Sequence, residues 1–140
     1  MSKRKKRNLI GKITLAIFVV LLLAAIFTNP DKAQHKKAFQ QRATATMDEI
    51  IQERNDALLS KAWQFVGANL LSKYIESNVE RSNYGFFSLT KILWDREKHV
   101  VGVGVFGKVF ITKKLDKDLI RPFLEEKEKE LNNWLSNMFK

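Results

Sequence analysis

The stretch from Gly102 to Val109 is the part of the chain whose residue types and spacing come nearest to a known chemical motif. Its letters, G-V-G-V-F-G-K-V, fit the glycine-rich loop of protein kinases, and the first six fit the dinucleotide-binding fingerprint. A dinucleotide site needs a helix after the glycines, whereas residues 108–111 have the composition of a strand. A kinase needs a catalytic loop and a metal-binding aspartate, and only 33 residues follow Gly107. We therefore interpret the glycines as a bulge, or as positions where a helix or other backbone approaches the strand closely.

The two histidines, His35 and His99, have no second ligand at metal-site spacing, such as four residues further along a helix. His35 is expected on a helix near the membrane, and His99 at a hairpin turn. Pairing across residues 95–98 would set His99 opposite Trp94, with Ser88 several residues away along the sheet, too far for a nucleophile and its base. No catalytic residue, cofactor or metal is predicted, and the chain is not expected to be an enzyme.

Neighbouring carboxylates occur at Asp48 and Glu49 and in the segment 125–130. Lysines interleave with the second group, which is typical of a solvated helix face and argues against acid–base chemistry. The chain has no cysteine, which excludes disulfides, thiolate metal sites, a thiol nucleophile and a lipid-modified cysteine.

An apolar segment near the N-terminus determines where the rest of the chain must lie. Residues 13–30 are 18 consecutive uncharged residues, and at about 1.5 Å each they span roughly 27 Å as a helix, close to the hydrocarbon thickness of a bilayer. The segment has no polar face, and a helix satisfies its own backbone hydrogen bonds in lipid. A removable signal peptide has the same description, but no Ala-x-Ala site follows the apolar core, so a retained anchor is the preferred prediction.

Much of the net charge of +10 lies before this segment, where six of the 25 basic residues occur without an acid. The rest of the chain has an ordinary mixed surface, so the basic composition indicates topology and no nucleic-acid partner is expected. The positive-inside rule predicts a cytoplasmic tail (1–12), a transmembrane signal-anchor in contact with lipid (13–30) and an extracytoplasmic domain (31–140) on the bacterial cytoplasmic membrane. The residues expected to determine this topology are Lys3, Arg4, Lys5, Lys6, Arg7 and Lys12.

The domain is expected to be α+β, with the element order α-α-β-β-α and an antiparallel hairpin packed on helices. Apolar residues of helical period predict one long helix or two consecutive helices over about 30–58 and 61–76. Asn29 is the expected cap at the start, and Ser60 or Gly67 the expected position of a break.

Runs of β-branched and aromatic residues predict the hairpin strands over 83–94 and 99–112, and residues 79–82 a short third strand. On the second strand one face is expected to carry Val101, Val103 and Val105, and the other Gly102 and Gly104.

A final helix is expected to open at Asp116 or Asp118. Its buried side would carry apolar residues at helical spacing from Leu119 onward, and its solvated side the charged segment 125–130. The helix ends in an amphipathic tail, for which we weigh core packing against contact with a partner or the membrane surface. The candidate partner surface comprises Trp134, Met138 and Phe139.

Two later segments, Asn83–Ser88 and Gly104–Phe110, follow the patterns Asn-Tyr-x-x-Phe-Ser and Gly-Val-x-Gly-x-Val-Phe. Together with the anchor, the Thr28–Lys32 segment and His35, they resemble an uncharacterised bacterial family of short membrane-anchored proteins, catalogued as a domain of unknown function. The resemblance covers residues 13–111, and the C-terminal helix is longer than it implies. It implies a bacterial envelope protein and adds no catalytic residue.

These observations favour a non-enzymatic, membrane-tethered interaction or scaffold protein of the bacterial envelope, with a protein partner or a second copy as its target. The alternative is a small lipid or apolar-ligand binding module in which the helices form a groove over the hairpin.

Overall fold

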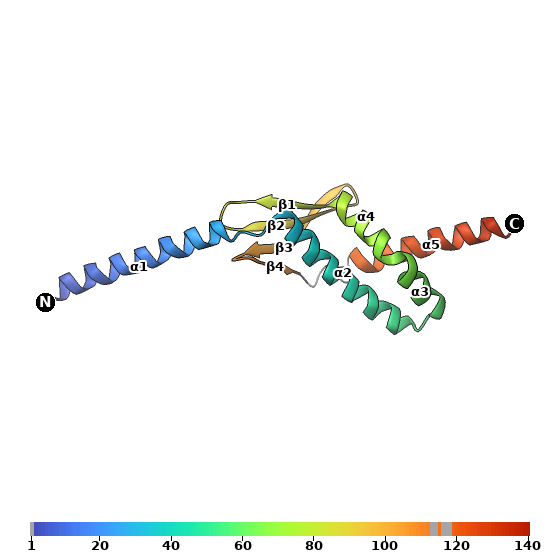
Figure 1. Ribbon diagram of the computed structural model, residues 1–140, viewed down its shortest axis with the longest axis horizontal. Coiled ribbons are helices and arrows are strands. Elements are labelled where there is room, and N and C mark those ends of the chain that lie inside the picture. Colours follow the sequence, from blue (N-terminus) through green and yellow to red (C-terminus); the bar gives the residue numbers. More distant parts are fainter. Residues whose placement is uncertain (1, 113–114, 116–118) are drawn as a thin grey trace.

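The N-terminal helix α1 (Lys3–Phe27) projects as a separate rod from an α+β domain in the computed structural model, which describes residues 2–112, 115 and 119–140 (Figure 1). The helix includes residues 3–12, which belong to the segment predicted as a basic cytoplasmic tail. Among the described residues it is the one helix long and apolar enough to cross a membrane. Its large apolar side chains are exposed to an extent that the core helix of a soluble protein would not show, among them Leu15, Ile17, Phe18, Val20, Leu21 and Phe27.

The N-cap of helix α2 (Lys32–Arg54) is Asp31, two residues after the cap predicted at Asn29. The Asp31 carboxylate accepts from the Gln34 backbone N–H at 2.8 Å, and the Gln34 side chain accepts from the Asp31 N–H at 2.9 Å. This reciprocal capping box satisfies two of the donors that a helix start leaves unpaired. The cap also fixes where the next turn of α2, with His35, lies.

The predicted C-terminal end of the first helix, at residue 58, is wrong, because the helix is interrupted at Asn55 and Asp56. Asn55 takes the left-handed conformation (φ 50°) that ends α2, and Asp56 caps α3 (Ala57–Ala62) by accepting from the N–H groups of Leu58 and Leu59. Asparagine is among the few non-glycine residues that adopt this conformation readily. Ser60, a predicted break position, lies inside α3.

The second predicted break position, Gly67, ends a π-helical turn, Trp63–Gly67, that connects α3 to α4 (Ala68–Asn78) without interrupting the helical path. A Cβ atom at Gly67 would lie 1.9 Å from Cε3 of Trp63, so the glycine makes room for the indole. The indole N–H donates to Asp48 Oδ1 at 2.9 Å, which ties this turn to α2.

The sheet has four antiparallel strands in the order β1 (Val79–Asn83), β2 (Ser88–Trp94), β3 (Glu97–Val105) and β4 (Lys108–Ile111). The α+β class, an antiparallel hairpin packed on helices and the short strand at 79–82 are confirmed, but the sheet has a fourth strand that was not expected. The predicted strand 99–112 is divided by a turn at Phe106 and Gly107, both at positive φ (49° and 73°).

The turn between β2 and β3 is tighter than expected, because Asp95 and Arg96 both adopt positive φ (49° and 65°) and Trp94 pairs with Glu97. His99 therefore lies opposite Ile92, and the predicted pairing with Trp94 is wrong. Two central residues at positive φ give a hairpin turn whose twist matches that of the strands.

A register shift beside Thr90 corrects the predicted faces of β3. Thr90 pairs with Gly102 and Lys91 with Val100, so Val101 is an extra residue on β3. As a result Val101 is buried together with Gly102, while Val103 is exposed on the opposite face. The prediction that Val101 and Val103 share one face, which assumed strict alternation along the strand, is therefore wrong.

One face of the sheet packs against α2 and α4, and the start of α5 (Arg121–Met138) closes the end of the core remote from α1 (Figure 1). The predicted helix start at Asp116 or Asp118 lies outside the described residues. The C-terminal turns of α5 extend beyond the core. The main buried side chains are Phe39, Ala43, Met47, Ile50, Leu71, Ile75, Val79, Ile92, Val101, Ile120 and Phe123.

Candidate functional site

His35 lies on the first turns of α2, directly against the core face of the sheet, and its side chain is fully buried. Its Nδ1 atom is 2.6 Å from Thr90 Oγ1 and its Nε2 atom 2.7 Å from Ser88 Oγ. Ser88 and His99 lie apart along the sheet, as predicted, because Ser88 pairs with Gly104 and the exposed His99 pairs with Ile92. The histidine that meets Ser88 is instead the one 53 residues before it.

Gly104 of the glycine-rich stretch provides the space for this imidazole, and Gly102 provides space for its partner Thr90. A Cβ atom at Gly104 would lie 2.7 Å from His35 Nε2 and 2.8 Å from Ser88 Oγ, and one at Gly102 would lie 2.9 Å from Thr90 Oγ1. Because real Cβ atoms do not approach so closely, only glycine fits at these positions without displacing the histidine or its partners. The expectation that a helix approaches the strand at a glycine is confirmed at Gly104, whereas the neighbours of Gly102 belong to β2 and β4.

Asn29, in the link between α1 and α2, continues the network on the other side of Ser88. Its amide nitrogen donates to Gly85 O at 2.7 Å, to Asn83 Oδ1 at 2.9 Å and to Phe87 O at 3.2 Å. Its Oδ1 accepts from the Ser88 hydroxyl at 2.7 Å. One side chain therefore joins the exit of α1 to the loop between β1 and β2.

The direction of every hydrogen bond in this network follows from Asn29. The surrounding carbonyl oxygens accept only, so they fix the amide nitrogen and leave Oδ1 toward Ser88. The Ser88 proton is then committed to Asn29, so Nε2 of His35 must be the donor to Ser88. In a neutral imidazole this leaves Nδ1 unprotonated, so that it accepts from the Thr90 hydroxyl. The network thus places the proton of a neutral imidazole on Nε2.

The electrostatic surroundings agree with a neutral imidazole. Burial, followed by the nearby Arg81 guanidinium, lowers the pKa of His35 below 6.5, while the Asp31 carboxylate acts in the opposite direction. A charged imidazole would lose its hydration and gain no buried counter-ion.

Ser88 and His35 lie within the hydrogen-bond distance that a nucleophile and its base require. However, both residues have 0% of their surface exposed, so no substrate reaches the serine oxygen. The serine proton also points to Asn29 and not to the histidine. What this arrangement can do is hold α2, the sheet and the exit of α1 in one relative position.

A sequence signal for the network does exist, although it is weak. Ser88 and Thr90 are polar residues on the same face of a predicted strand, and Gly102 and Gly104 lie opposite them. A buried polar pair facing two missing side chains calls for a polar group from another element. Sequence spacing alone does not say that His35 is that group.

A second feature is an apolar groove of about 310 Å³ between α3, the π-helical turn and α4 on one side and α5 on the other. The helices α3 and α5 that bound it lie at the end of the domain remote from α1 (Figure 1). Arg54 of α2 pairs with Glu128 of α5 at 2.6 Å beside the groove. Its lining residues include Trp63, Val66, Leu70, Leu124, Leu131 and Trp134.

Of the candidate partner surface, Trp134 and Met138 are each 57% exposed and Phe139 is 84% exposed. The alternative in which these three side chains pack in the core is therefore wrong. Trp134 also lines the groove, so the exposed apolar face of α5 is continuous with it.

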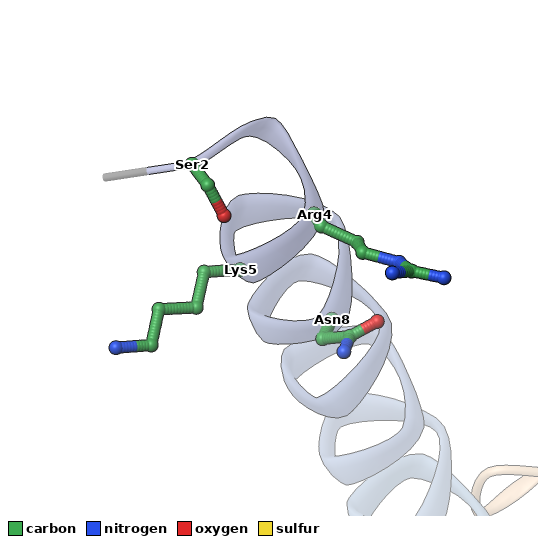
Figure 2. A pocket seen from close by; sticks show the side chains of 4 residues that line it. All are labelled: Ser2, Arg4, Lys5 and Asn8. Atoms are coloured by element: carbon green, nitrogen blue, oxygen red, sulfur yellow. The ribbon is translucent and has the colours of Figure 1, made fainter.

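A larger hollow of about 550 Å³ lies beside the first turns of α1 and is lined by Ser2, Arg4, Lys5 and Asn8 (Figure 2). All four side chains are exposed and come from a single stretch of chain, so no opposite wall encloses a ligand. Lys5 and Arg4 project from different sides of the helix (Figure 2). We therefore interpret this hollow as the space between charged side chains at the end of a helix and not as a binding site.

No group of three His, Cys, Asp or Glu side chains that would hold a metal occurs among the described residues. No family model, curated protein or solved structure matches the chain. The resemblance based on Asn83–Ser88 and Gly104–Phe110 therefore stays a prediction.

Replacing Gly104 by alanine is expected to destabilise the domain by about 1–3 kcal/mol, because the added methyl overlaps His35 and Ser88. This loss outweighs the gain of roughly 0.4–1 kcal/mol that a Gly→Ala change gives where the backbone tolerates it. Chemical unfolding followed by tryptophan fluorescence measures the difference. Gly11→Ala is the matched control, since nothing lies within 4 Å of its Cβ position. Equal stability of the two variants would contradict the close approach of His35.

Acidification is expected to destabilise the protein through His35. Its pKa is lower in the folded state than the ordinary 6.5, so below that pH the unfolded chain binds the proton more readily than the folded one. The free energy of unfolding should therefore fall as the pH drops through about 6.5, and level off below the folded-state pKa. Unfolding curves of the wild type and His35→Gln between about pH 8 and pH 5 test this. A wild-type pH dependence in that window no steeper than that of His35→Gln would refute it.

Proposed function

We propose that the protein is a non-enzymatic binding module of the bacterial envelope, tethered to the cytoplasmic membrane by α1, with its domain on the extracytoplasmic side. Transferring the apolar side chains of α1 from water to lipid is favourable by about 1.5–3 kcal/mol each. Because they are exposed on all sides, the sum favours a bilayer over water by a wide margin. The basic residues before the apolar stretch support a cytoplasmic N-terminus.

The groove beside α5 is the single observation that carries the binding role. It is open, apolar and bounded by helices, and it continues onto the exposed side chains of Trp134 and Met138. An amphipathic helix of a protein partner fits such a trough by laying its apolar face into it. Lys127, Glu128 and Glu130 at the rim supply charges of both signs for the polar edges of that helix.

The burial of Ser88 and His35 supports a role without catalysis, because the nucleophile–base pair nearest to a catalytic arrangement is closed to substrates.

An apolar small ligand or lipid chain is the second candidate, and the volume of the groove favours it. About 310 Å³ is at the lower end of the range for small-molecule sites. The location differs from the groove predicted over the hairpin, since the space between α2, α4, α5 and the sheet is only about 10 Å³. The core is therefore filled, and the ligand would have to lie between helices.

Photocrosslinking from Leu70, which lines the groove and is 46% exposed, tests the binding role in the full-length protein in its own membrane. A benzophenone amino acid at Leu70 is expected to give a discrete adduct, identified by mass spectrometry as one protein or a second copy. The same group at Leu58, which is 66% exposed but outside the groove, is the matched control.

Leu131→Lys in the groove wall should reduce the adduct several-fold. A lipid or other small apolar adduct with no protein would favour the second candidate. Identical adducts from Leu70 and Leu58 would contradict both.

A further inference from the structure

Two loops lie at the end of the sheet that faces α1: Tyr84–Phe87 between β1 and β2, and Phe106–Gly107 between β3 and β4 (Figure 1). Asn29 donates to the carbonyl of Gly85 at 2.7 Å, and a Cβ atom at Gly107 would lie 3.8 Å from the carbonyl oxygen of Thr28. Both loops are therefore level with the last turn of α1.

Each of these segments presents an exposed aromatic side chain beside the end of α1. The exposed fractions are 84% for Phe27, 50% for Tyr84, 47% for Phe86 and 52% for Phe106. The ring of Tyr84 stacks on Phe87 at 4.9 Å, and that of Phe86 lies 5.0 Å from Phe87, so the first loop forms one aromatic cluster. Aromatic side chains gathered from three separate segments are costly to leave in water.

The backbone at Phe106 is a second, independent observation. Its φ of 49° is in the left-handed region, which costs a bulky residue energy and which glycine or asparagine adopts more easily. If the turn only connected β3 to β4, glycine or asparagine would serve at this position at a lower conformational cost than phenylalanine. The side chain it projects is more than half exposed, so folding of the domain does not explain it either.

The length of α1 sets the depth of these aromatics, on the proposal above that α1 spans the membrane. From Ile13, directly after the last basic residue, to Phe27 the helix rises roughly 21 Å, at about 1.5 Å per residue. A hydrocarbon layer is about 30 Å thick, so Phe27 lies in its outer part and the two loops beside it reach the outer boundary. Phenylalanine side chains suit the outer part of the acyl region, and tyrosine the polar interface.

We propose that Phe27, Tyr84, Phe86 and Phe106 form an aromatic collar that inserts into the outer-leaflet interface of the bilayer around α1. Lys108, exposed directly after the second loop, faces the lipid phosphates. The collar and the Asn29 hydrogen bonds hold the domain upright, so that the groove beside α5 points away from the membrane. The bilayer is thus a second binding surface for the domain itself.

Site-directed spin labelling tests the collar, because the chain has no cysteine to remove. Phe86→Cys, Phe106→Cys, Val20→Cys and Val100→Cys are labelled singly in the full-length protein, in nanodiscs of phosphatidylethanolamine and phosphatidylglycerol. Accessibility to oxygen and to a water-soluble nickel complex reports the depth of each label. Val20 lies in α1, and Val100 is an equally exposed aliphatic residue (54%) on β3, nearer the turn at the opposite end of the sheet.

Labels at positions 86, 106 and 20 are expected to be accessible to oxygen and protected from nickel, with the label at 100 accessible to nickel. A label in lipid at 20 but in water at 86 and 106 would overturn the collar and leave the anchor intact. A label in water at 20 would overturn the anchor and the collar together. Lipid exposure at 100 as well would overturn the upright orientation.

A second comparison keeps the aromatics in place. A label at Lys108→Cys, beside the intact collar, is expected to gain several-fold in nickel accessibility when Phe86→Ser and Phe106→Ser are added. Both serines replace exposed side chains, so the fold should survive, and circular dichroism checks that it does. An unchanged accessibility at position 108 would overturn the collar.

Discussion

The hydrogen bonds around Asn29 are the constraint on which the domain's arrangement depends. Backbone carbonyls leave its amide one orientation, and that orientation directs the protons of Ser88, His35 and Thr90 in turn. Each of these groups is buried or partly buried, and an unpaired polar group in such a place costs about 1–3 kcal/mol. The network is therefore stable only when it is complete, which fixes the first turns of α2 on the sheet and the loop between β1 and β2 at the exit of α1.

This joint explains how a small domain maintains a defined orientation next to a helix that projects away from it (Figure 1). The capping box at Asp31 sets the start of α2. Gly104 lets α2 approach the sheet closely enough for His35 to reach both hydroxyls, and Gly102 leaves room for the Thr90 hydroxyl. At the opposite end, Gly67 gives room to the Trp63 indole and so shapes one wall of the groove. In both places the absence of a side chain at a glycine leaves room for a large side chain.

Features encoded by neighbouring residues were predictable: the apolar span of α1, the α+β class, the short strand at 79–82 and the close approach at the glycines. The predictions failed where one residue decided the geometry. Asn55 ends α2 early through its left-handed backbone, and the extra residue Val101 reverses the expected faces of β3. The network was missed because its members are 53 to 59 residues apart, and no local periodicity encodes such a pairing.

The protonation state of His35 is the most direct test of this joint, since the hydrogen-bond directions place the proton of a neutral ring on Nε2. Nitrogen NMR of the imidazole in the full-length protein near pH 7 distinguishes a protonated nitrogen from an unprotonated one. We expect a neutral ring with the proton on Nε2 and an unprotonated Nδ1. A proton on Nδ1 alone would contradict the network that begins at Asn29, and a charged imidazole would contradict the lowered pKa of His35.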